Sequence, residues 1–153
     1  MEIQYIIGDA TRPIGRGNKI IAHVCNDIGA WGAGFVLAIS KRWPQPKTEY
    51  LKEKQLHGLT LGTVGFVQVE ENTWVANMIA QRDIRSHDGV PPIRYDALKL
   101  CLAAVAIHAR ELKAIVHMPR IGCGLAGGKW ELIEPLIREA LKDVQVFVYD
   151  LPQ

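Results

Sequence analysis

The chain is poor in cysteine and in net charge, and each shortage excludes a class of protein. Its 153 residues contain three cysteines, Cys25, Cys101 and Cys123, an odd number without Cys-x-x-Cys spacing. This pattern argues against a disulfide framework or a zinc site, so we expect no bound metal, and it favours a reducing compartment. The formal net charge is only +2, with basic and acidic residues interleaved. No broad basic face for duplex nucleic acid is therefore expected.

Long hydrophobic runs are also missing. No stretch of about 18 apolar residues occurs, so no membrane span is expected. Residues 1–7 lead directly into a short alternating strand and carry no basic, apolar leader. These absences predict a cytoplasmic protein that has neither a membrane nor duplex nucleic acid as its partner.

The composition predicts one folded domain over residues 1–153. Hydrophobic residues make up 48% of the chain and charged residues 22%, as in soluble globular proteins. Strands are predicted at 3–7, 19–24, 63–69, 74–80, 114–118 and 144–149, and helices at 35–42, 47–56, 93–113 and 130–141. Their alternation predicts an α/β fold with helices on both faces of the sheet, and one hairpin makes the sheet mixed. Pro135 predicts a break in the last helix, because an internal proline costs about 3 kcal/mol.

The segment Met118–Gly128 is the most informative part of the sequence. It places four glycines around Cys123, between an apolar strand and the helix former that begins at Lys129. Glycines let consecutive backbone N–H groups turn toward one point, and the following helix N-terminus adds partial positive charge. The pattern predicts a phosphate-binding loop, and a carboxylate placed at Gly122 is expected to fill the phosphate site. An ordinary tight turn is the alternative.

A second glycine loop, Cys25–Gly34, also connects a predicted strand to a helix. Its spacing Gly-x-x-Gly-x-Gly is neither the dinucleotide fingerprint nor a P-loop. The amide of Asn26 could bond ribose hydroxyls, and Trp31 is either a core residue or a pocket wall. Two such loops predict two walls around one polyphosphate.

Other polar residues allow two interpretations each. Asp9, directly after the first strand, could accept a hydrogen bond from an adenine amine, or could simply cap a turn. Cys123 could be a nucleophile, although a small residue packed beneath the loop is favoured. His23 and His117 are interpreted as core residues, and His87 is the one histidine expected near a site.

In combination, these segments resemble a macro domain. The resemblance rests on Gly8-Asp9, Ile21–Asn26, Gly32–Phe35 and Met118–Leu125, which occur in the family's order. Pro119–Leu125, followed by Trp130-Glu131, is most similar to the branch of terminal ADP-ribose protein glycohydrolase and its bacterial relatives. The resemblance implies a three-layer αβα fold around a six-stranded mixed sheet, with ADP-ribose bound in a cleft and no cofactor.

The resemblance also implies roles for individual residues. Asp9 would contact the adenine amine, Tyr149 would stack near the adenine, and Ile121–Leu125 would cradle the diphosphate. The residues it assigns to the ligand are Asp9, Ala10, Asn26, Gly29, Trp31, Gly32, Gly34, Phe35, Pro119, Arg120, Ile121, Gly122, Cys123, Gly124, Leu125, Ala126 and Tyr149.

Two departures bear on the chemistry that the resemblance implies. The glycohydrolase has a catalytic aspartate where this chain has Ala126, and a lysine where this chain has Gln81-Arg82. Its covalent mechanism therefore does not carry over, and Gln81 and Asn26 remain as candidate catalytic residues. We expect a hydrolase that removes ADP-ribose from acidic side chains of proteins. A non-catalytic reader of ADP-ribose and an ADP-ribose 1″-phosphate phosphatase are the alternatives.

Overall fold

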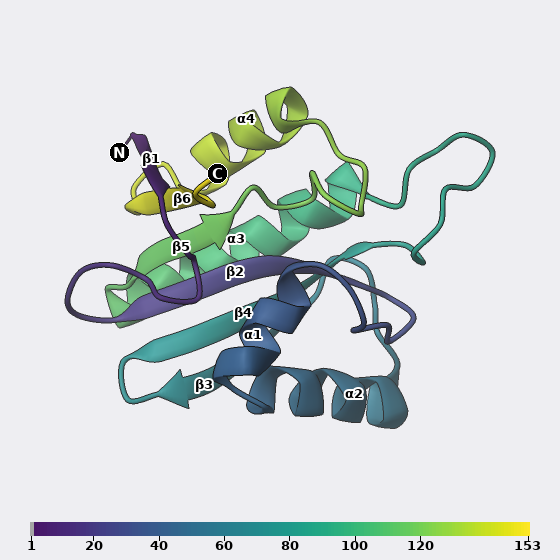
Figure 1. The fold of residues 1–153 in the computed structure, drawn as a ribbon, viewed down its shortest axis with the longest axis horizontal. Helices are drawn as coiled ribbons and strands as arrows, with labels where there is room; N and C mark the ends of the chain where they lie inside the picture. The colour runs from purple at the N-terminus through teal and green to yellow at the C-terminus, as the bar shows by residue number, and fades with distance from the viewer. Residues whose placement is uncertain (1) are drawn as a thin grey trace.

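A six-stranded sheet forms the centre of the protein in a computed structural model that describes residues 2–153 (Figure 1). Its strands are β1 (Ile3–Ile7), β2 (Lys19–Asn26), β3 (Val64–Glu70), β4 (Thr73–Gln81), β5 (Ile115–Pro119) and β6 (Val146–Asp150). They lie in the order β1-β6-β5-β2-β4-β3. Every neighbouring pair is parallel except the antiparallel hairpin of β3 and β4. The parallel strands therefore end together along one edge of the sheet.

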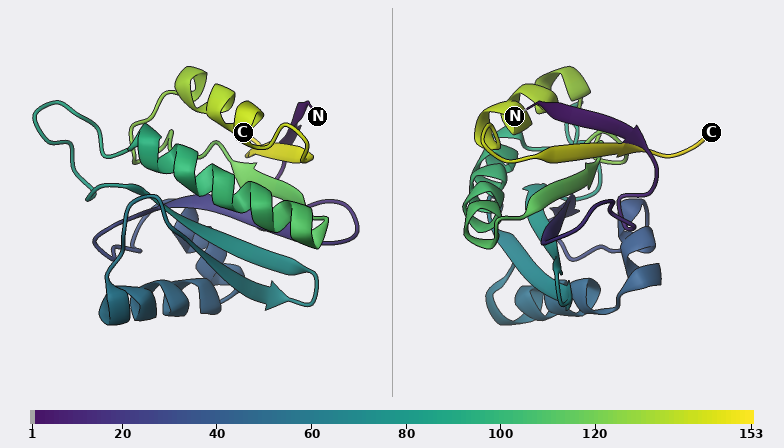
Figure 2. Two further views of the ribbon diagram at one scale, coloured as in Figure 1. Left: turned by 180° about the vertical axis from the view of Figure 1, so that it is seen from behind. Right: turned by 90° about the vertical axis from the view of Figure 1, so that its left-hand side faces the viewer.

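Four helices within residues 2–153 cover the sheet. They are α1 (Phe35–Arg42), α2 (Gln45–His57), α3 (Tyr95–Leu112) and α4 (Trp130–Ala140). Figure 2 shows α3 and α4 together on one side of the sheet and α1 on the other, with α2 beside it. Each side has its own hydrophobic core, the larger one against α3 and α4. The predicted three-layer αβα fold with a mixed six-stranded sheet is confirmed.

The central strands β2 and β4 are buried on both faces, as their nearly continuous apolar sequences predict. Two polar residues inside them satisfy each other. Nε2 of His23 lies 2.6 Å from Oδ1 of Asn77, whose amide donates to the carbonyl of Pro46 at 3.1 Å. Burial lowers the pKa of His23 to about 4, against the opposing effect of this hydrogen bond. His23 is therefore a neutral core residue, as predicted.

Helix boundaries differ from the predictions at two prolines. The helix α4 runs without a break through Pro135, so the predicted fresh start at this residue is wrong. Pro135 lies less than two turns from the start of α4 and removes a single helical hydrogen bond, while Ile133 and Ile137 anchor the helix in the core. Similarly, α2 begins at Gln45 because a proline is compatible with the first turn of a helix.

The connection from β4 to α3 stands out from the body of the molecule (Figure 1). It runs from residue 82 to residue 94, because Gln81 still belongs to β4 and α3 begins at Tyr95. Its tip is a turn in which the N–H groups of His87 and Val90 donate to each other's carbonyls at 3.0 and 2.9 Å. Within residues 2–153, no helix has both the length and the apolar character needed to cross a membrane.

Candidate functional site

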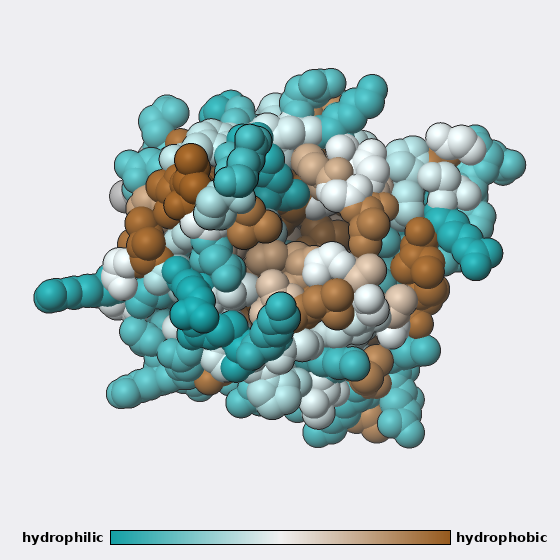
Figure 3. Space-filling model, in the orientation of Figure 1, coloured by the Kyte–Doolittle hydropathy of each residue, from teal (hydrophilic) through white to brown (hydrophobic). Residues whose placement is uncertain are grey.

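A cavity of about 970 Å³ opens at the edge where the parallel strands end. This volume is at the upper end of the range for small-ligand pockets. Figure 3 shows the surface hollowed near the centre of the view, with apolar residues around the opening. The cavity is lined by most of the predicted site residues: Asp9, Ala10, Asn26, Gly32, Gly34, Phe35, Gln81, Pro119, Arg120, Ile121, Gly122, Gly124, Leu125, Ala126 and Tyr149.

Three of the predicted residues lie elsewhere. Trp31 is 6% exposed and packs in the core beside α1, where its indole N–H donates to the hydroxyl of Ser40 at 2.8 Å. Of its two predicted roles, the structure therefore supports the core residue. Gly29 and Cys123 are partly buried beside the cavity without lining it.

The N-terminus of α1 faces the cavity without a side-chain cap. Gly34 precedes the helix with φ 84°, a left-handed conformation that favours glycine, and its carbonyl accepts the N–H of Leu37 at 3.1 Å. Backbone N–H groups in the first turn of a helix lack partners inside the helix. Phe35 and Val36, the first residues of α1, line the cavity, so this helix end offers donors to an anion.

The glycine loop of residues 121–128 lies across the cavity from this helix end. It is folded on itself, because the N–H of Gly128 donates to the carbonyl of Gly122 at 2.7 Å and that of Gly127 to Gly124 at 3.1 Å. The Leu125 side chain reaches over to α1, where a Cβ atom on Gly34 would lie 3.3 Å from its Cδ1 atom. The two loops therefore form opposite walls of one narrow site, as the sequence predicts.

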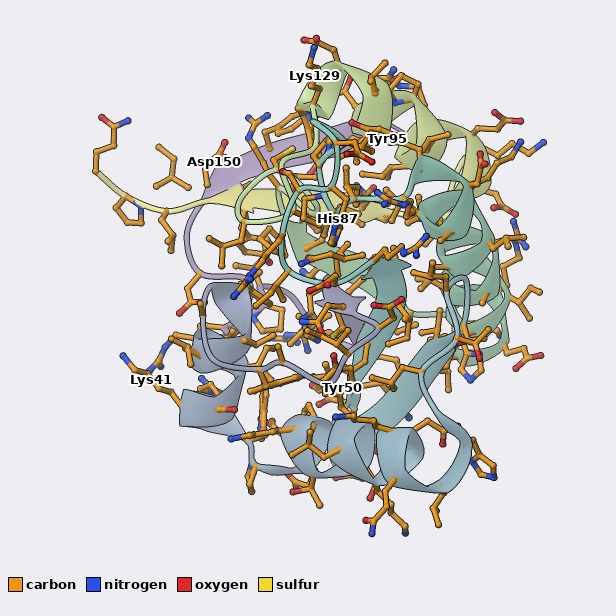
Figure 4. All side chains as sticks on the ribbon, turned by 90° about the vertical axis from the view of Figure 1, so that its right-hand side faces the viewer. Lys41, Tyr50, His87, Tyr95, Lys129 and Asp150 are labelled. Carbon is orange, nitrogen blue, oxygen red and sulfur yellow. The ribbon has the colours of Figure 1, made fainter. Side chains whose placement is uncertain are left out.

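Asn26 shapes the first of these loops. Its side-chain amide donates to the carbonyl of Ala30 at 2.7 Å, and its Oδ1 accepts from the N–H groups of Ile28 and Ala30 at 3.2 and 3.0 Å. The hydroxyl of Tyr50 lies 2.8 Å from the same oxygen. Figure 4 places Tyr50 in the interior, above α2. Asn26 thus uses both ends of its amide to hold the loop.

One end of the cavity carries Asp9, Arg120 and Tyr149. Oδ1 of Asp9 accepts hydrogen bonds from the N–H and hydroxyl of Thr11 at 2.8 and 2.7 Å, so Asp9 does form the turn that was one of its two predicted roles. No hydrogen bond to Oδ2 occurs within residues 2–153. Arg120 makes a bidentate pair with Asp150 at 2.7 and 3.0 Å, which lowers the pKa of that carboxyl. Burial raises the pKa of Tyr149.

The other end of the cavity carries Asn26 and Gln81, the last residues of β2 and β4. The Gln81 amide donates to the carbonyl of Asp83 at 2.9 Å, which leaves its Oε1 as the remaining acceptor. The carboxylate of Asp27 accepts the N–H of Asp83 at 2.7 Å, so it joins the loop after β2 to the loop after β4. Among residues 2–153, the titratable side chains that line this end are those of the neutral His23 and the buried Cys25.

The remaining titratable groups offer no activated nucleophile. Burial raises the pKa of both Cys25 and Cys123, so neither thiol is a ready thiolate. His87 lies on the projecting loop, with Nε2 3.3 Å from the Asp83 carboxylate, and does not line the cavity. Within residues 2–153, no three His, Cys, Asp or Glu side chains gather as a metal site would require.

Several lining residues were not predicted. Ile84 is 49% exposed and brings an apolar side chain to the cavity from an otherwise polar loop, and that contrast was its signal in the sequence. Leu151, 73% exposed beyond β6, had no such signal. His23 and Cys25 lie on the cavity side of β2, which only the register of the sheet reveals.

Solved structures with the same fold and high identity identify the family. The chain is 58% identical to a protein of unknown function from Bacteroides thetaiotaomicron, with a TM-score of 0.96 over 99% of both chains. It is 51% identical to a macrodomain protein from Streptomyces coelicolor, with a TM-score of 0.85 over 97% of this chain and 99% of that one. A DarTG structure from Thermosipho africanus in complex with ADP-ribose shares the fold at 19% identity, with a TM-score of 0.67 over 87% of this chain and 38% of that one.

Relatives of known name are more distant. The chain is 32% identical over 154 residues to the Chromodomain-helicase-DNA-binding protein 1-like of Danio rerio, with 95% of this chain aligned to only 15% of that protein. It is 28% identical over 147 residues to the ADP-ribose 1″-phosphate phosphatase of Candida albicans, covering 90% of this chain and 92% of that one. No model of a protein family matches the chain. The chain belongs to the macro domain family, as its likeness to the Streptomyces coelicolor protein shows.

Proposed function

We propose that the cavity binds ADP-ribose. The observation that carries this proposal is the pair of facing glycine walls, the start of α1 and the loop 121–128, in a cavity large enough for a dinucleotide-sized ligand. Backbone N–H groups on both walls suit a diphosphate, since they bind negative charge without a counter-cation. The structure from Thermosipho africanus, solved with ADP-ribose, supports the same ligand.

The two ends of the cavity suit the two ends of this ligand. In the proposed orientation, Oδ2 of Asp9 accepts the adenine amine, and the ring of Tyr149 lies beside the base. The distal ribose then lies near Asn26 and Gln81. Leu125 and Ile84 are apolar residues at the cavity and would limit the access of water to the diphosphate and the distal ribose.

We further propose that the domain hydrolyses the ester that joins ADP-ribose to glutamate or aspartate side chains of proteins. A carboxylate is a good leaving group, so this bond requires less acid or base assistance than a glycosidic ether. The distal end offers amides instead of an acid–base pair, which suits a reaction that depends on positioning. Oε1 of Gln81 would accept a hydrogen bond from the attacking water and orient it, while the carboxylate that leaves takes up the proton that the water loses. Asn26 would keep the loop against the ribose.

Two other functions remain as alternatives. A reader that binds ADP-ribose without chemistry is favoured by the neutral His23 and the two unactivated thiols. Hydrolysis of ADP-ribose 1″-phosphate is favoured by the likeness to the Candida albicans phosphatase. The three functions require the same binding cavity.

One experiment separates these functions. The protein is incubated with glutamate-linked ADP-ribosylated protein, with serine-linked protein and with ADP-ribose 1″-phosphate, and free ADP-ribose is measured. Release from the glutamate conjugate alone is expected. Release only from the phosphate would assign the phosphatase function, and no release together with intact ADP-ribose binding would assign the reader. No binding of ADP-ribose in calorimetry would refute all three.

A further inference from the structure

A second, polar cleft lies away from the cavity, where β2 and β4 begin. Its volume is about 360 Å³, and it is lined by Arg12, Pro13, Lys19, Arg42, Trp43, Glu70, Asn72 and Thr73. Lys19 and Thr73 are paired neighbours at the first residues of the two strands, whereas Asn26 and Gln81 at the far ends belong to the main cavity. The two sites thus lie at opposite ends of the same strands.

Lys19 is unusual because it is a buried lysine. The residue is 8% exposed, and its ammonium donates one hydrogen bond, to the carbonyl of Gly17 at 3.1 Å. An ammonium has three donors, and a buried cation is stable when an anion or several acceptors surround it. No carboxylate among residues 2–153 forms an ion pair with Lys19.

The positive charge of Lys19 also affects the pKa of a buried histidine, His117. Burial is the main cause that lowers the pKa of His117 to about 4, and the positive charge of Lys19 is the second. The positive charge of Lys19 therefore acts on His117, in the neighbouring strand β5.

The carboxylate in this cleft, Glu70, contacts Trp43 and Arg42 instead of Lys19. Oε2 of Glu70 accepts the indole N–H of Trp43 at 2.9 Å and lies 3.5 Å from Nη2 of Arg42. The Arg42 guanidinium lies over the Trp43 ring, 4.9 Å from its centroid. Glu70 therefore balances Arg42, and the cleft keeps the positive charges of Lys19 and Arg12, neither of which has a carboxylate partner among residues 2–153.

We propose that this cleft, called here the Lys19 cleft, is a second anion site that binds a phosphate group, either as inorganic phosphate or as a small phosphate monoester. Lys19 provides the buried charge, and the flexible Arg12 closes on the anion from the loop between β1 and β2. The Asn72 amide donates one N–H to the Gly17 carbonyl at 3.1 Å and keeps the other as a neutral donor, and its Oδ1 accepts the Thr73 hydroxyl at 3.2 Å. Arg12 follows Asp9 by three residues in one turn, closed by the N–H of Arg12 on the Asp9 carbonyl at 2.9 Å, so the same turn contributes to both sites.

The test uses the indole N–H signals of the tryptophans as local reporters in NMR spectra of the full chain. Inorganic phosphate and ribose 5-phosphate are titrated separately, with sodium chloride at matched ionic strength as the control. Trp43 lies in the Lys19 cleft, whereas Trp31 lies beside the main cavity. We expect either phosphate compound to shift Trp43, and the one that binds more tightly identifies the source of the phosphate.

Variants then assign the shift to the cleft. Arg12→Gln is expected to weaken binding by about tenfold, the effect of one charge-assisted hydrogen bond, and Lys19→Met to abolish it. Lys41→Gln is the matched control, because Lys41 is exposed beside Arg42 and points away from the body of the molecule in Figure 4. Should Lys19→Met fail to fold, Arg12→Gln, on an exposed loop, carries the test alone. No shift of Trp43 beyond the sodium chloride control, or equal binding by the Arg12→Gln protein, would overturn the proposal.

Discussion

Gly122 lies directly against Ile93: a Cβ atom on this glycine would stand 2.9 Å from Cδ1 of Ile93 and 3.1 Å from Cδ1 of Ile133. Its φ of 73° disfavours any other residue as well. A glutamate there would press into the core and strain the backbone, instead of entering the phosphate site as the sequence suggested. Gly124 is the better position, because a side chain there would meet nothing within 4 Å and would start at the cavity wall.

Gly124→Glu is expected to abolish ADP-ribose binding while the domain stays folded, since the carboxylate would lie beside the proposed diphosphate position and repel it. Calorimetry measures the binding, and thermal unfolding checks the fold. Gly65→Glu is the matched control, because Gly65 is exposed on β3, has the same open space and lies outside the cavity. Normal affinity of the Gly124→Glu protein would exclude the loop 121–128 as the diphosphate site.

Asp9→Asn is expected to change the base that the cavity prefers. Asparagine keeps Oδ1 and with it the two hydrogen bonds from Thr11, while Oδ2 becomes an amide donor. The variant should bind ADP-ribose more weakly by about 1.5–3 kcal/mol, the range for a hydrogen bond to a charged group. It should lose less affinity for the inosine analogue, whose base has a carbonyl in place of the amine. Equal losses of affinity for both ligands in calorimetry would show that Asp9 forms the turn but does not contact the adenine amine.

Asn26→Ala is expected to lower the free energy of unfolding by about 1–3 kcal/mol, because it strands the buried groups that this amide satisfies. Among them are the carbonyl of Ala30 and the N–H groups of Ile28 and Ala30. Urea denaturation measures the loss, and the affinity for ADP-ribose should fall with it. Tyr50→Phe removes the contacts of the hydroxyl with the backbone carbonyl and Oδ1 of Asn26 but keeps the hydrogen bonds of this amide to the loop, so it should show a smaller loss of stability. An Asn26→Ala protein as stable as the parent would refute the role of Asn26 in holding the loop.

The stability of the domain should fall as the pH drops from about 6.5 to about 4. The pKa of His23 and that of His117 are both lowered from 6.5 to about 4, by burial first. In this window the unfolded chain takes up protons that the folded state rejects, so each ring destabilises the fold by up to about 1.4 kcal/mol per pH unit. Urea denaturation at several pH values measures the slope.

His117→Phe should make this dependence on pH shallower. The ring of His117 already stacks on Phe147 with centroids 5.6 Å apart, and its Nε2 has no hydrogen-bond partner among the described residues. His57→Phe, on the exposed end of α2, controls for the loss of a histidine. If the free energy of unfolding depends on pH as steeply in the His117→Phe protein as in the parent, His117 does not contribute to this dependence.

Gln81→Ala should reduce hydrolysis of glutamate-linked ADP-ribose by about tenfold, since a misplaced water lowers the rate without removing an acid or base. The affinity for ADP-ribose should change little, so the effect should appear in kcat. No ADP-ribose–lysine adduct should form during turnover, and mass spectrometry of the quenched protein checks this. An adduct on any lysine would refute the proposed mechanism.

The sequence by itself determined the order of the elements and the place of the site. The nearly all-apolar run in β2 is typical of a strand that is covered on both faces, as β2 is. Glycine loops at the ends of two parallel strands predict that both walls lie at one edge of the sheet, which they do. These features depend on residues close together in the chain, so local patterns reveal them.

Only the tertiary structure decided which way individual side chains face. Trp31 enters the core because Ser40 and Tyr50 receive it there, and the Cβ direction of Gly122 points at Ile93 from another loop. The cleft at Lys19 exists only where the starts of β2 and β4 lie beside Arg12 and Arg42. Each of these outcomes is fixed when the layers of the fold pack together, and the local pattern of the sequence does not show it.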